Sequence, residues 1–255
     1  MPELYLKTID NAAIFANWSS VEGSAKVALF LHQRSKDHTI WNNLRKMLHE
    51  KGWSTLAIDL RGHGKSDGFR PQTRADFTPN QSLRHGTGQA RTDAEKNSLR
   101  FDRVDNYHSM MFDVTAAADF IRNEFSALSP QQNSGQAAKS YELAVIGSSI
   151  GANLALAYAA DHFEVKATVL LSPGLDYFGL RTDDVMIQYH RPLVLLTAKD
   201  DPSYPDVQKL IKLPGVARQN LWYQEFDTGG HGVRLLEAHP EMMEKIAEWM
   251  EKQIA

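Results

Sequence analysis

The chain has 255 residues, of which 42% are hydrophobic, and its formal net charge is −3. This length and composition suit one large α/β domain over residues 1–255, and the charge excludes the basic surface with which proteins bind nucleic acid. Because the chain has no cysteine, disulfides, thiolate nucleophiles and zinc sites built on thiolates are excluded.

The sequence contains no signal for export or membrane insertion. Residues 1–7 lack the basic region and the long apolar region of a secretion signal, and no later apolar run has the length of a membrane span. We therefore expect a cytoplasmic protein that acts on a small molecule and binds neither nucleic acid nor a membrane.

The first part of the chain predicts a hairpin and then alternating strands and helices. Asp10-Asn11 separates two short strand-like runs, which is typical of a hairpin turn. Two later runs are apolar almost throughout, as in strands buried on both faces, and Gly52 ends the helix between them. The expected strands are 4–9, 13–18, 26–31 and 54–60, and the expected helix covers 41–48.

A glycine-rich turn, Arg61-Gly62-His63-Gly64-Lys65-Ser66, follows the strand at 54–60. Its last three residues match the end of a phosphate-binding P-loop, but that motif requires a glycine where this chain has Asp59. We therefore exclude a nucleotide site. From 67 to 106 the chain loses its periodicity, and we expect an insertion there whose role the sequence leaves open.

The alternation of strands and helices resumes after the insertion. A helix with one apolar stripe is expected from 111 to 125, before a Ser/Gln/Gly linker at 130–138. The stretch 175–191 is short, so we expect a small cap or none. Later strands are expected at 142–146, 165–171, 192–197 and 221–226, and later helices directly after position 149 and over 204–213 and 240–249.

The stretch from Val145 to Asn153 has the pattern of a nucleophile elbow. Such an elbow holds a serine on a strained turn between a strand and a helix, with glycines two residues to either side. Ser149 meets this requirement, since Gly147 and Gly151 flank it, whereas Ser148 is flanked by two isoleucines. The predicted nucleophile is Ser149.

Alternating buried strands and amphipathic helices predict a mostly parallel sheet with helices on both faces, whose ligand lies beyond the carboxyl ends of the strands. Ser149, an aspartate pair at 200–201 and His231 all follow strands, in the order serine, acid, histidine. In this respect the chain resembles the α/β-hydrolase family, whose triad has the same order. The resemblance covers nearly the whole chain except the insertion, and it implies the α/β-hydrolase fold.

His231 lies in a glycine-flanked loop that can bring an imidazole close to another backbone, and it is the predicted base. His63, in the turn that the family carries away from the catalytic centre, is expected to be structural. The resemblance places the acid three residues after the small residue that ends the strand, which counts from Ala198 to Asp201. Asp200 stays open as the acid, and Asp176 is a remoter alternative.

The resemblance also implies an oxyanion hole made of two backbone N–H groups, from Ile150 and from Gln33. The family usually has His-Gly where this chain has His32-Gln33. The Gln33 side chain therefore stands where glycine leaves space, and it either narrows the acyl pocket or adds an amide donor.

These residues predict a serine carboxylesterase-like hydrolase that cleaves an ester or thioester through an acyl-enzyme, with no cofactor and no metal. A serine at the elbow argues against epoxide hydrolases and haloalkane dehalogenases of the family, which use an aspartate. The alternative is a non-catalytic binding protein of the same fold. The physiological substrate, its acyl chain length and the oligomeric state stay open.

Overall fold

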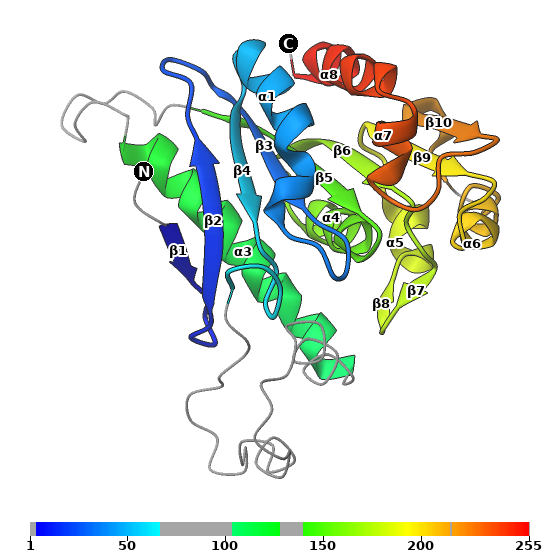
Figure 1. Cartoon of the computed structure of the whole chain (residues 1–255), viewed down its shortest axis with the longest axis horizontal. Helices are drawn as coiled ribbons and strands as arrows, with labels where there is room; N and C mark the ends of the chain where they lie inside the picture. The colour runs from blue at the N-terminus through cyan, green and yellow to red at the C-terminus, as the bar shows by residue number, and fades with distance from the viewer. Residues whose placement is uncertain (1–3, 67–103, 128–139, 215, 255) are drawn as a thin grey trace, which may run out of the picture.

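Runs of apolar residues form the centre of a mostly parallel sheet, because strands buried on both faces need no polar alternation. The computed structural model describes residues 4–66, 104–127, 140–214 and 216–254 (Figure 1). In these residues the main sheet has eight strands in the order β1-β2-β4-β3-β5-β6-β9-β10. Its strands are β1 (Leu4–Lys7), β2 (Ala13–Ser19), β3 (Lys26–Leu31), β4 (Ser54–Ile58), β5 (Glu142–Ser148), β6 (Val165–Leu171), β9 (Leu193–Ala198) and β10 (Leu221–Phe226).

The sheet is antiparallel at one edge and parallel elsewhere. β1 pairs with β2, and β2 with β4, in antiparallel register, while the strands from β4 to β10 run parallel. The carboxyl ends of β3, β5, β6, β9 and β10 therefore lie along one edge. This edge carries the loops in which the sequence places the candidate site residues.

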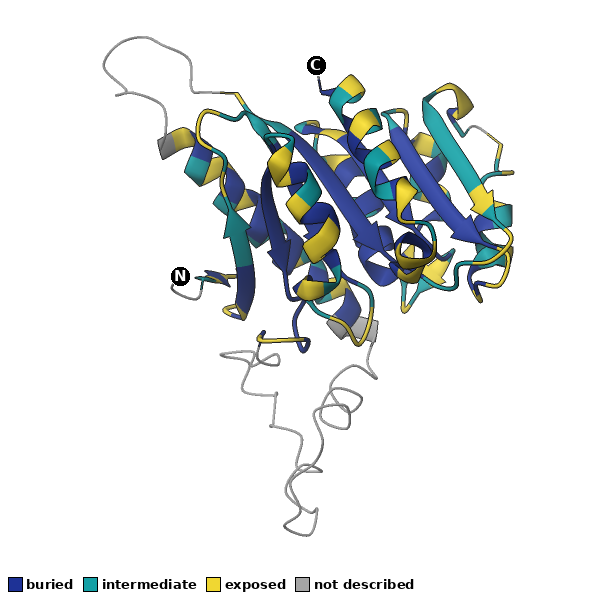
Figure 2. Ribbon diagram, turned by 45° about the horizontal axis from the view of Figure 1, so that its top comes forward, coloured by how far each residue is buried: buried dark blue, intermediate teal, exposed yellow. Residues whose placement is uncertain are grey.

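Helices cover both faces of the sheet (Figures 1 and 2). The central strands are buried between two hydrophobic clusters, and the outward sides of the helices are exposed. On one face lie α1 (Asn42–Glu50), α7 (Arg234–Ala238) and α8 (Glu241–Gln253), and on the other α3 (Val104–Ala127), α4 (Ile150–Asp161), α5 (Asp183–Gln188) and α6 (Tyr204–Leu210). Two 3-10 turns, η1 (His38–Trp41) and η3 (Arg218–Asn220), precede α1 and β10. No helix in the described ranges is long and apolar enough to cross a membrane.

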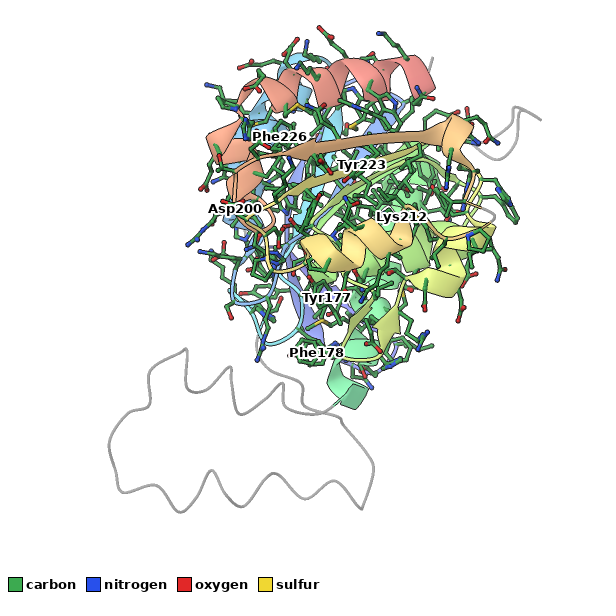
Figure 3. The ribbon with its side chains drawn as sticks, turned by 90° about the vertical axis from the view of Figure 1, so that its right-hand side faces the viewer. Tyr177, Phe178, Asp200, Lys212, Tyr223 and Phe226 are labelled. Atoms are coloured by element: carbon green, nitrogen blue, oxygen red, sulfur yellow. The ribbon has the colours of Figure 1, made fainter. Side chains whose placement is uncertain are left out.

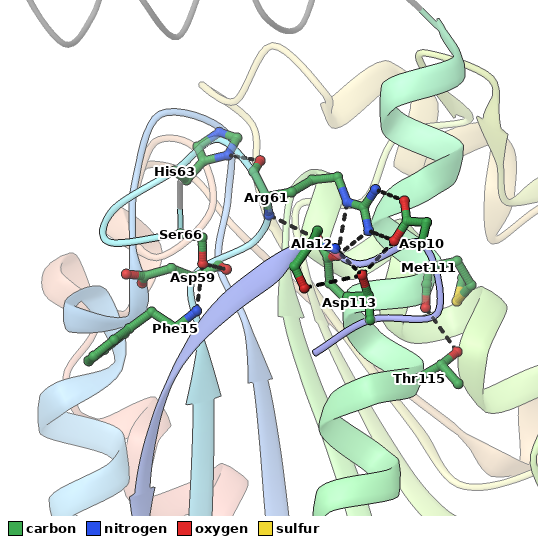
Figure 4. A network of polar contacts seen from close by, with 11 residues as sticks. Asp10, Ala12, Phe15, Asp59, Arg61, His63, Ser66, Met111, Asp113 and Thr115 are labelled. Atoms are coloured by element: carbon green, nitrogen blue, oxygen red, sulfur yellow. Dashed lines mark hydrogen bonds and ion pairs between the residues drawn. The ribbon is translucent and has the colours of Figure 1, made fainter. Parts of the chain in front are cut away.

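A buried ion network ties the β1–β2 hairpin to α3 (Figure 4). The Arg61 guanidinium donates to Asp113 of α3 at 2.6 and 2.9 Å and to Asp10 of the hairpin at 2.6 and 3.1 Å. The Arg61 backbone N–H also donates to Asp113, at 2.9 Å. The glycine-rich turn is thus a structural joint between the antiparallel edge and the helix layer.

The structure confirms the predicted parallel sheet with helices on both faces, and the strands at 26–31, 165–171 and 221–226 have the predicted bounds. Other boundaries differ: β1 and β4 end two residues before their predicted ends, at Lys7 and Ile58, and α6 ends at Leu210 and not at position 213. The largest difference is at α3, which begins at Val104 and not at position 111, three residues inside the predicted insertion. The rest of that insertion, residues 67–103, lies outside the described residues. Within 175–191 the chain forms a small hairpin of β7 (Asp176–Tyr177) and β8 (Leu180–Arg181). Strands of two residues are too short to show a periodic pattern, so the sequence did not predict them.

Candidate active site

Ser149 lies on a sharp turn between β5 and α4. Its φ of 55° and ψ of −121° are far from the ordinary regions for a residue with a side chain, which is the strained conformation expected of an elbow. A Cβ at Gly147 would overlap the Gly151 carbonyl, and a Cβ at Gly151 would overlap the Leu31 carbonyl at the end of β3. The two glycines of the motif are therefore required by close backbone packing.

His231, in the loop after β10, contacts Asp201, in the loop after β9. The distance between His231 Nδ1 and Asp201 Oδ1 is 2.8 Å, and the Asp201 side chain is fully buried. Oδ1 also accepts from the Ser203 backbone N–H at 2.7 Å and from the Ser203 hydroxyl at 2.9 Å. Burial raises the pKa of Asp201, but the His231 ring, the nearby Ser172 hydroxyl and the Ser203 N–H lower it by more, so the pKa is below its usual value. Asp201 is therefore an ionised partner for the imidazole.

The other two candidate acids have different partners. Asp200 is exposed, and its carboxylate accepts from the backbone N–H groups of Gly229 and Gly230 at 3.3 and 2.9 Å. Asp176 accepts from the Gly179 N–H at 2.6 Å inside the β7–β8 turn. Asp200 thus holds the beginning of the His231 loop, and Asp176 holds a hairpin turn.

The loops of Ser149 and His231 meet at the end of β6. The Ser149 N–H donates to the Leu171 carbonyl at 2.8 Å, and the N–H of Gly232 donates to the Ser172 hydroxyl at 2.8 Å. In the described part of the chain the Ser149 hydroxyl and His231 make no hydrogen bond to each other. Catalytic hydrogen bonds are often long without substrate, so this geometry is compatible with a serine and its base.

The two predicted oxyanion-hole donors lie at the ends of β3 and β5. Ile150 is the first residue of α4, so its N–H has no partner within the helix. Across the described ranges the Gln33 N–H makes no hydrogen bond, and the neighbouring His32 ring holds the Gln33 carbonyl. His32 Nε2 accepts from the Leu60 N–H at 2.9 Å, so the proton is on Nδ1, which donates to the Gln33 carbonyl at 2.8 Å. Burial lowers the pKa of His32 to about 3, which keeps this imidazole neutral.

Sequence reasoning missed Tyr177, which lies in the β7–β8 hairpin and is labelled in Figure 3. The Tyr177 ring packs on Gly174, and its hydroxyl lies 3.5 Å from the Ser172 carbonyl. Burial raises the pKa of Tyr177, although the hydroxyls of Ser203 and Ser149, which both face the phenol, lower it. A tyrosine hydroxyl therefore lies beside the candidate nucleophile.

The hairpin is held by a buried amide one turn after Ser149. Asn153 Nδ2 donates to the carbonyls of Gly174 and Leu180 at 3.1 and 2.7 Å, and Asn153 Oδ1 accepts from the Gly174 N–H at 3.1 Å. At the hairpin tip the exposed Phe178 ring stacks on Tyr107 of α3, with ring centroids 4.0 Å apart. One indication of this contact is present in the sequence: Asn153 is a polar residue in a mostly apolar helix, and a buried polar side chain needs hydrogen-bond partners.

His63 is buried in the glycine-rich turn, where its Nδ1 lies 3.1 Å from the Arg61 carbonyl oxygen. Nearby, Asp37, His38 and Asp59 bring three potential metal ligands within 4.8 Å of one another. Both oxygens of Asp59 already accept hydrogen bonds: Oδ1 from the His38 backbone and ring at 2.7 and 2.6 Å, and Oδ2 from the Lys65 N–H at 2.8 Å. The Asp59 carboxylate therefore stabilises the turn through these hydrogen bonds.

Solved structures with the same fold include several esterases. The most similar solved structures include the Pyrococcus furiosus esterase Pf2001, with TM-score 0.70 and 18% identity, covering 100% of this chain and 90% of that one. They also include Est1E of Butyrivibrio proteoclasticus with bound ferulic acid, with TM-score 0.67 and 16% identity, covering 98% and 99% of the two chains. An esterase from Exiguobacterium antarcticum has TM-score 0.65 and 13% identity, covering 98% and 100%.

The sequence has no significant match among curated protein sequences. The model of one protein family, described as serine aminopeptidase, S33, matches residues 23–188, which is more than half of the chain. Together with the sheet order and the esterase structures of the same fold, this match shows that the chain is a hydrolase-type α/β protein. The chain belongs to the serine aminopeptidase, S33, family of α/β hydrolases.

Proposed function

We propose that this protein is a serine hydrolase that cleaves a carboxylic ester or thioester through an acyl-enzyme intermediate. The observation that carries the proposal is the 2.8 Å contact between His231 and the buried Asp201, beside a serine on a strained turn. A serine hydroxyl is a weak nucleophile unless a neighbouring base accepts its proton. The elbow supplies the nucleophile, and the two adjacent strand ends supply the base and its partner.

In the proposed mechanism Ser149 attacks the substrate carbonyl while His231 Nε2 accepts the hydroxyl proton. Asp201 accepts a hydrogen bond from Nδ1, which leaves Nε2 free to act as the base and stabilises the imidazolium. The backbone N–H groups of Ile150 and Gln33 are the proposed donors to the developing oxyanion. His231 then protonates the departing alcohol or thiol, and water releases the acyl group by the reverse sequence of proton transfers.

An ester is the proposed substrate because the solved structures of the same fold include several esterases. The ferulic acid bound to Est1E makes an aromatic ester one class to test. The family description, serine aminopeptidase, makes an aminoacyl amide another. The alternative function is a binding protein without chemistry, for which the ionised Asp201 and its contact with His231 would have no use.

The catalytic proposal predicts how strongly each single substitution lowers kcat. Ser149→Ala and His231→Ala should each lower kcat by roughly 10⁴- to 10⁶-fold, and Asp201→Asn somewhat less, because triad members act as a unit. Asp200→Asn is the matched control for the acid, since its carboxylate contacts only the loop backbone in the described chain. It should retain most of the activity. An inactive Asp200→Asn beside an active Asp201→Asn would reverse the assignment of the acid.

The first experiment is labelling with a fluorophosphonate, followed by a substrate panel. The wild-type chain should be labelled on Ser149, and Ser149→Ala should not, since the probe reacts with activated serines. The panel comprises p-nitrophenyl esters of increasing length, methyl ferulate and aminoacyl p-nitroanilides. A chain that is neither labelled nor active on any of them would support the binding protein instead.

A further inference from the structure

The side chain of Gln33 joins three loops of the candidate site. Its Oε1 accepts a hydrogen bond from the Ser148 hydroxyl at 2.9 Å and another from the Val233 backbone N–H at 3.0 Å. Ser148 precedes the nucleophile, and Val233 lies two residues after the candidate base. Gln33 itself follows β3, so one amide oxygen ties the ends of β3 and β5 to the loop that carries His231.

The orientation of this amide follows from its partners. A backbone N–H can only donate, so the atom opposite Val233 must be the oxygen of Gln33 and not its nitrogen. Gly232, which precedes Val233, has a φ of 66°. A Cβ at this position would overlap both Gln33 Oε1 and Ser148 Oγ. The loop therefore packs directly on the amide, which requires glycine at position 232.

Other residues hold the His231 loop before and at Gly232, and Gln33 holds it after Gly232. Asp200 holds Gly229 and Gly230 before the histidine, Asp201 holds the His231 ring, and Ser172 holds the Gly232 N–H. Beyond Gly232, the next bond from the loop to the strand-end region is the one from Val233 to Gln33. Without this acceptor the Val233 N–H and the Ser148 hydroxyl would both lose their partner.

We propose that Gln33 is a positioning residue, whose side-chain oxygen locks the His231 loop against the nucleophile elbow. The proposal rests on the proposed function, because the benefit of the lock is to hold His231 Nε2 toward Ser149. A misplacement of about 1 Å in a catalytic group can cost on the order of 100-fold in rate. The observation behind this role is that Gln33 Oε1 accepts hydrogen bonds from two neighbouring loops.

The test is Gln33→Met, which keeps the length of the side chain and removes the acceptor, while the backbone N–H at position 33 stays. We expect kcat to fall about 10- to 100-fold, with KM changed less than about 3-fold, and fluorophosphonate labelling to slow in parallel. Gln208→Met is the matched control, because Gln208 is also half-buried and its amide donates to the Tyr223 hydroxyl at 2.7 Å on the surface of α6. This control should keep wild-type kinetics.

A second readout does not depend on turnover. The proton between His231 Nδ1 and Asp201 should give a low-field proton resonance in the wild type. This resonance should broaden or disappear in Gln33→Met and stay in Gln208→Met. Two carboxylates bond to the His231 loop, Asp201 to the ring and Asp200 to the Gly230 N–H, and neither is changed in these variants. The Arg234 and His239 side chains, which lie beside Gly230 and Gly229, are unchanged as well. A role confined to packing or to the oxyanion hole would leave this resonance intact.

Ser148→Ala completes the design as a double-mutant cycle. Alone it should lower kcat only a few-fold, roughly 2- to 5-fold, because the bond from Val233 remains, and in the Gln33→Met background it should have no further effect. If Gln33→Met does not fold, Gln33→Asn replaces it, since its shorter amide cannot reach both donors. If the wild type is active and the Gln33 variant has the same kcat and the same resonance, the proposed positioning role of Gln33 is wrong.

If the wild type has no activity, the proposed function is wrong. The resonance of the Gln33 variant would then still test whether Gln33 holds the His231 loop in place.

Discussion

At the scale of single residues, the site depends on buried polar groups whose protonation is set by their surroundings. His32 is the clearest example, because it is completely buried, accepts one backbone N–H and donates to the Gln33 carbonyl. Only the neutral imidazole can do both. His32 thus orients the peptide that follows β3 while staying outside the proposed chemistry.

This arrangement predicts how stability changes with pH. Burial lowers the pKa of His32 from 6.5 to about 3 in the folded chain, so below pH 6.5 the unfolded chain binds a proton that the folded chain does not. The free energy of unfolding should therefore fall, by up to about 1.4 kcal/mol per pH unit, as the pH drops from 6.5 toward 3.

Urea unfolding between pH 7 and pH 4, for the wild type and for His32→Gln, measures this effect. A glutamine amide can also accept and donate, but it does not titrate, so the variant should show a shallower loss of stability on acidification. Other titrating groups contribute to both proteins, and the difference between the two slopes isolates His32. Equal slopes would show that His32 does not contribute as described.

At the scale of elements, the β7–β8 hairpin is a small cap that the sheet does not hold directly. Its base is attached to α4 by Asn153 and its tip to α3 by the stack of Phe178 on Tyr107. Phe178 has a φ of 56°, which is costly for an aromatic residue and is maintained by the surrounding turn. The hairpin thereby keeps Tyr177 beside Ser149.

Tyr177→Phe tests the contribution of this hairpin to catalysis. The variant keeps the ring on Gly174 and removes the hydroxyl that faces Ser149, so kcat/KM should fall by about 3- to 10-fold, the effect of one hydrogen bond. Tyr189→Phe is the control, because its buried hydroxyl lies 2.8 Å from the Thr168 hydroxyl away from the elbow and should affect stability only. Equal kcat/KM in the wild type and in Tyr177→Phe would reduce the role of Tyr177 to packing.

At the scale of the whole molecule, two hydrophobic clusters sandwich the sheet, and one buried ion network crosses from its antiparallel edge to the helix layer. The Arg61 and Asp113 side chains are both inaccessible to solvent. Burial raises the pKa of Asp113 to about 6, although Arg61 opposes this rise. The carboxylate thus depends on its partner, since an unpaired buried charge is very unfavourable.

Arg61→Met should therefore destabilise the fold by about 3–5 kcal/mol, the usual effect of removing one partner from a buried ion pair. The control is Arg122→Met on α3, whose pair with Asp119 is about half exposed on both side chains and should contribute about 0–1 kcal/mol. Denaturant unfolding measures both. A loss below 1 kcal/mol in Arg61→Met would mean that the network is dispensable for the fold.

The sequence by itself determined the order of the main strands and helices, because short apolar runs bounded by turn residues indicate buried strands and longer amphipathic stretches indicate helices. It also determined the register of the elbow, since only Ser149 has glycines on both sides at the required spacing, and the structure shows that both glycines are needed for backbone packing. These features are local, so neighbouring residues are enough to predict them.

Only the tertiary structure decided which groups meet. Asp200 and Asp201 are adjacent in the chain, and a single peptide step directs one to the loop backbone and the other to the His231 ring. The Gln33 side chain bonds to residues 115 and 200 positions away, and Tyr177 reaches Ser149 on strands too short for any periodic signal. Contacts of this kind arise where the ends of separate strands converge on one edge of the sheet, and the pattern along the chain does not encode which side chains face one another there.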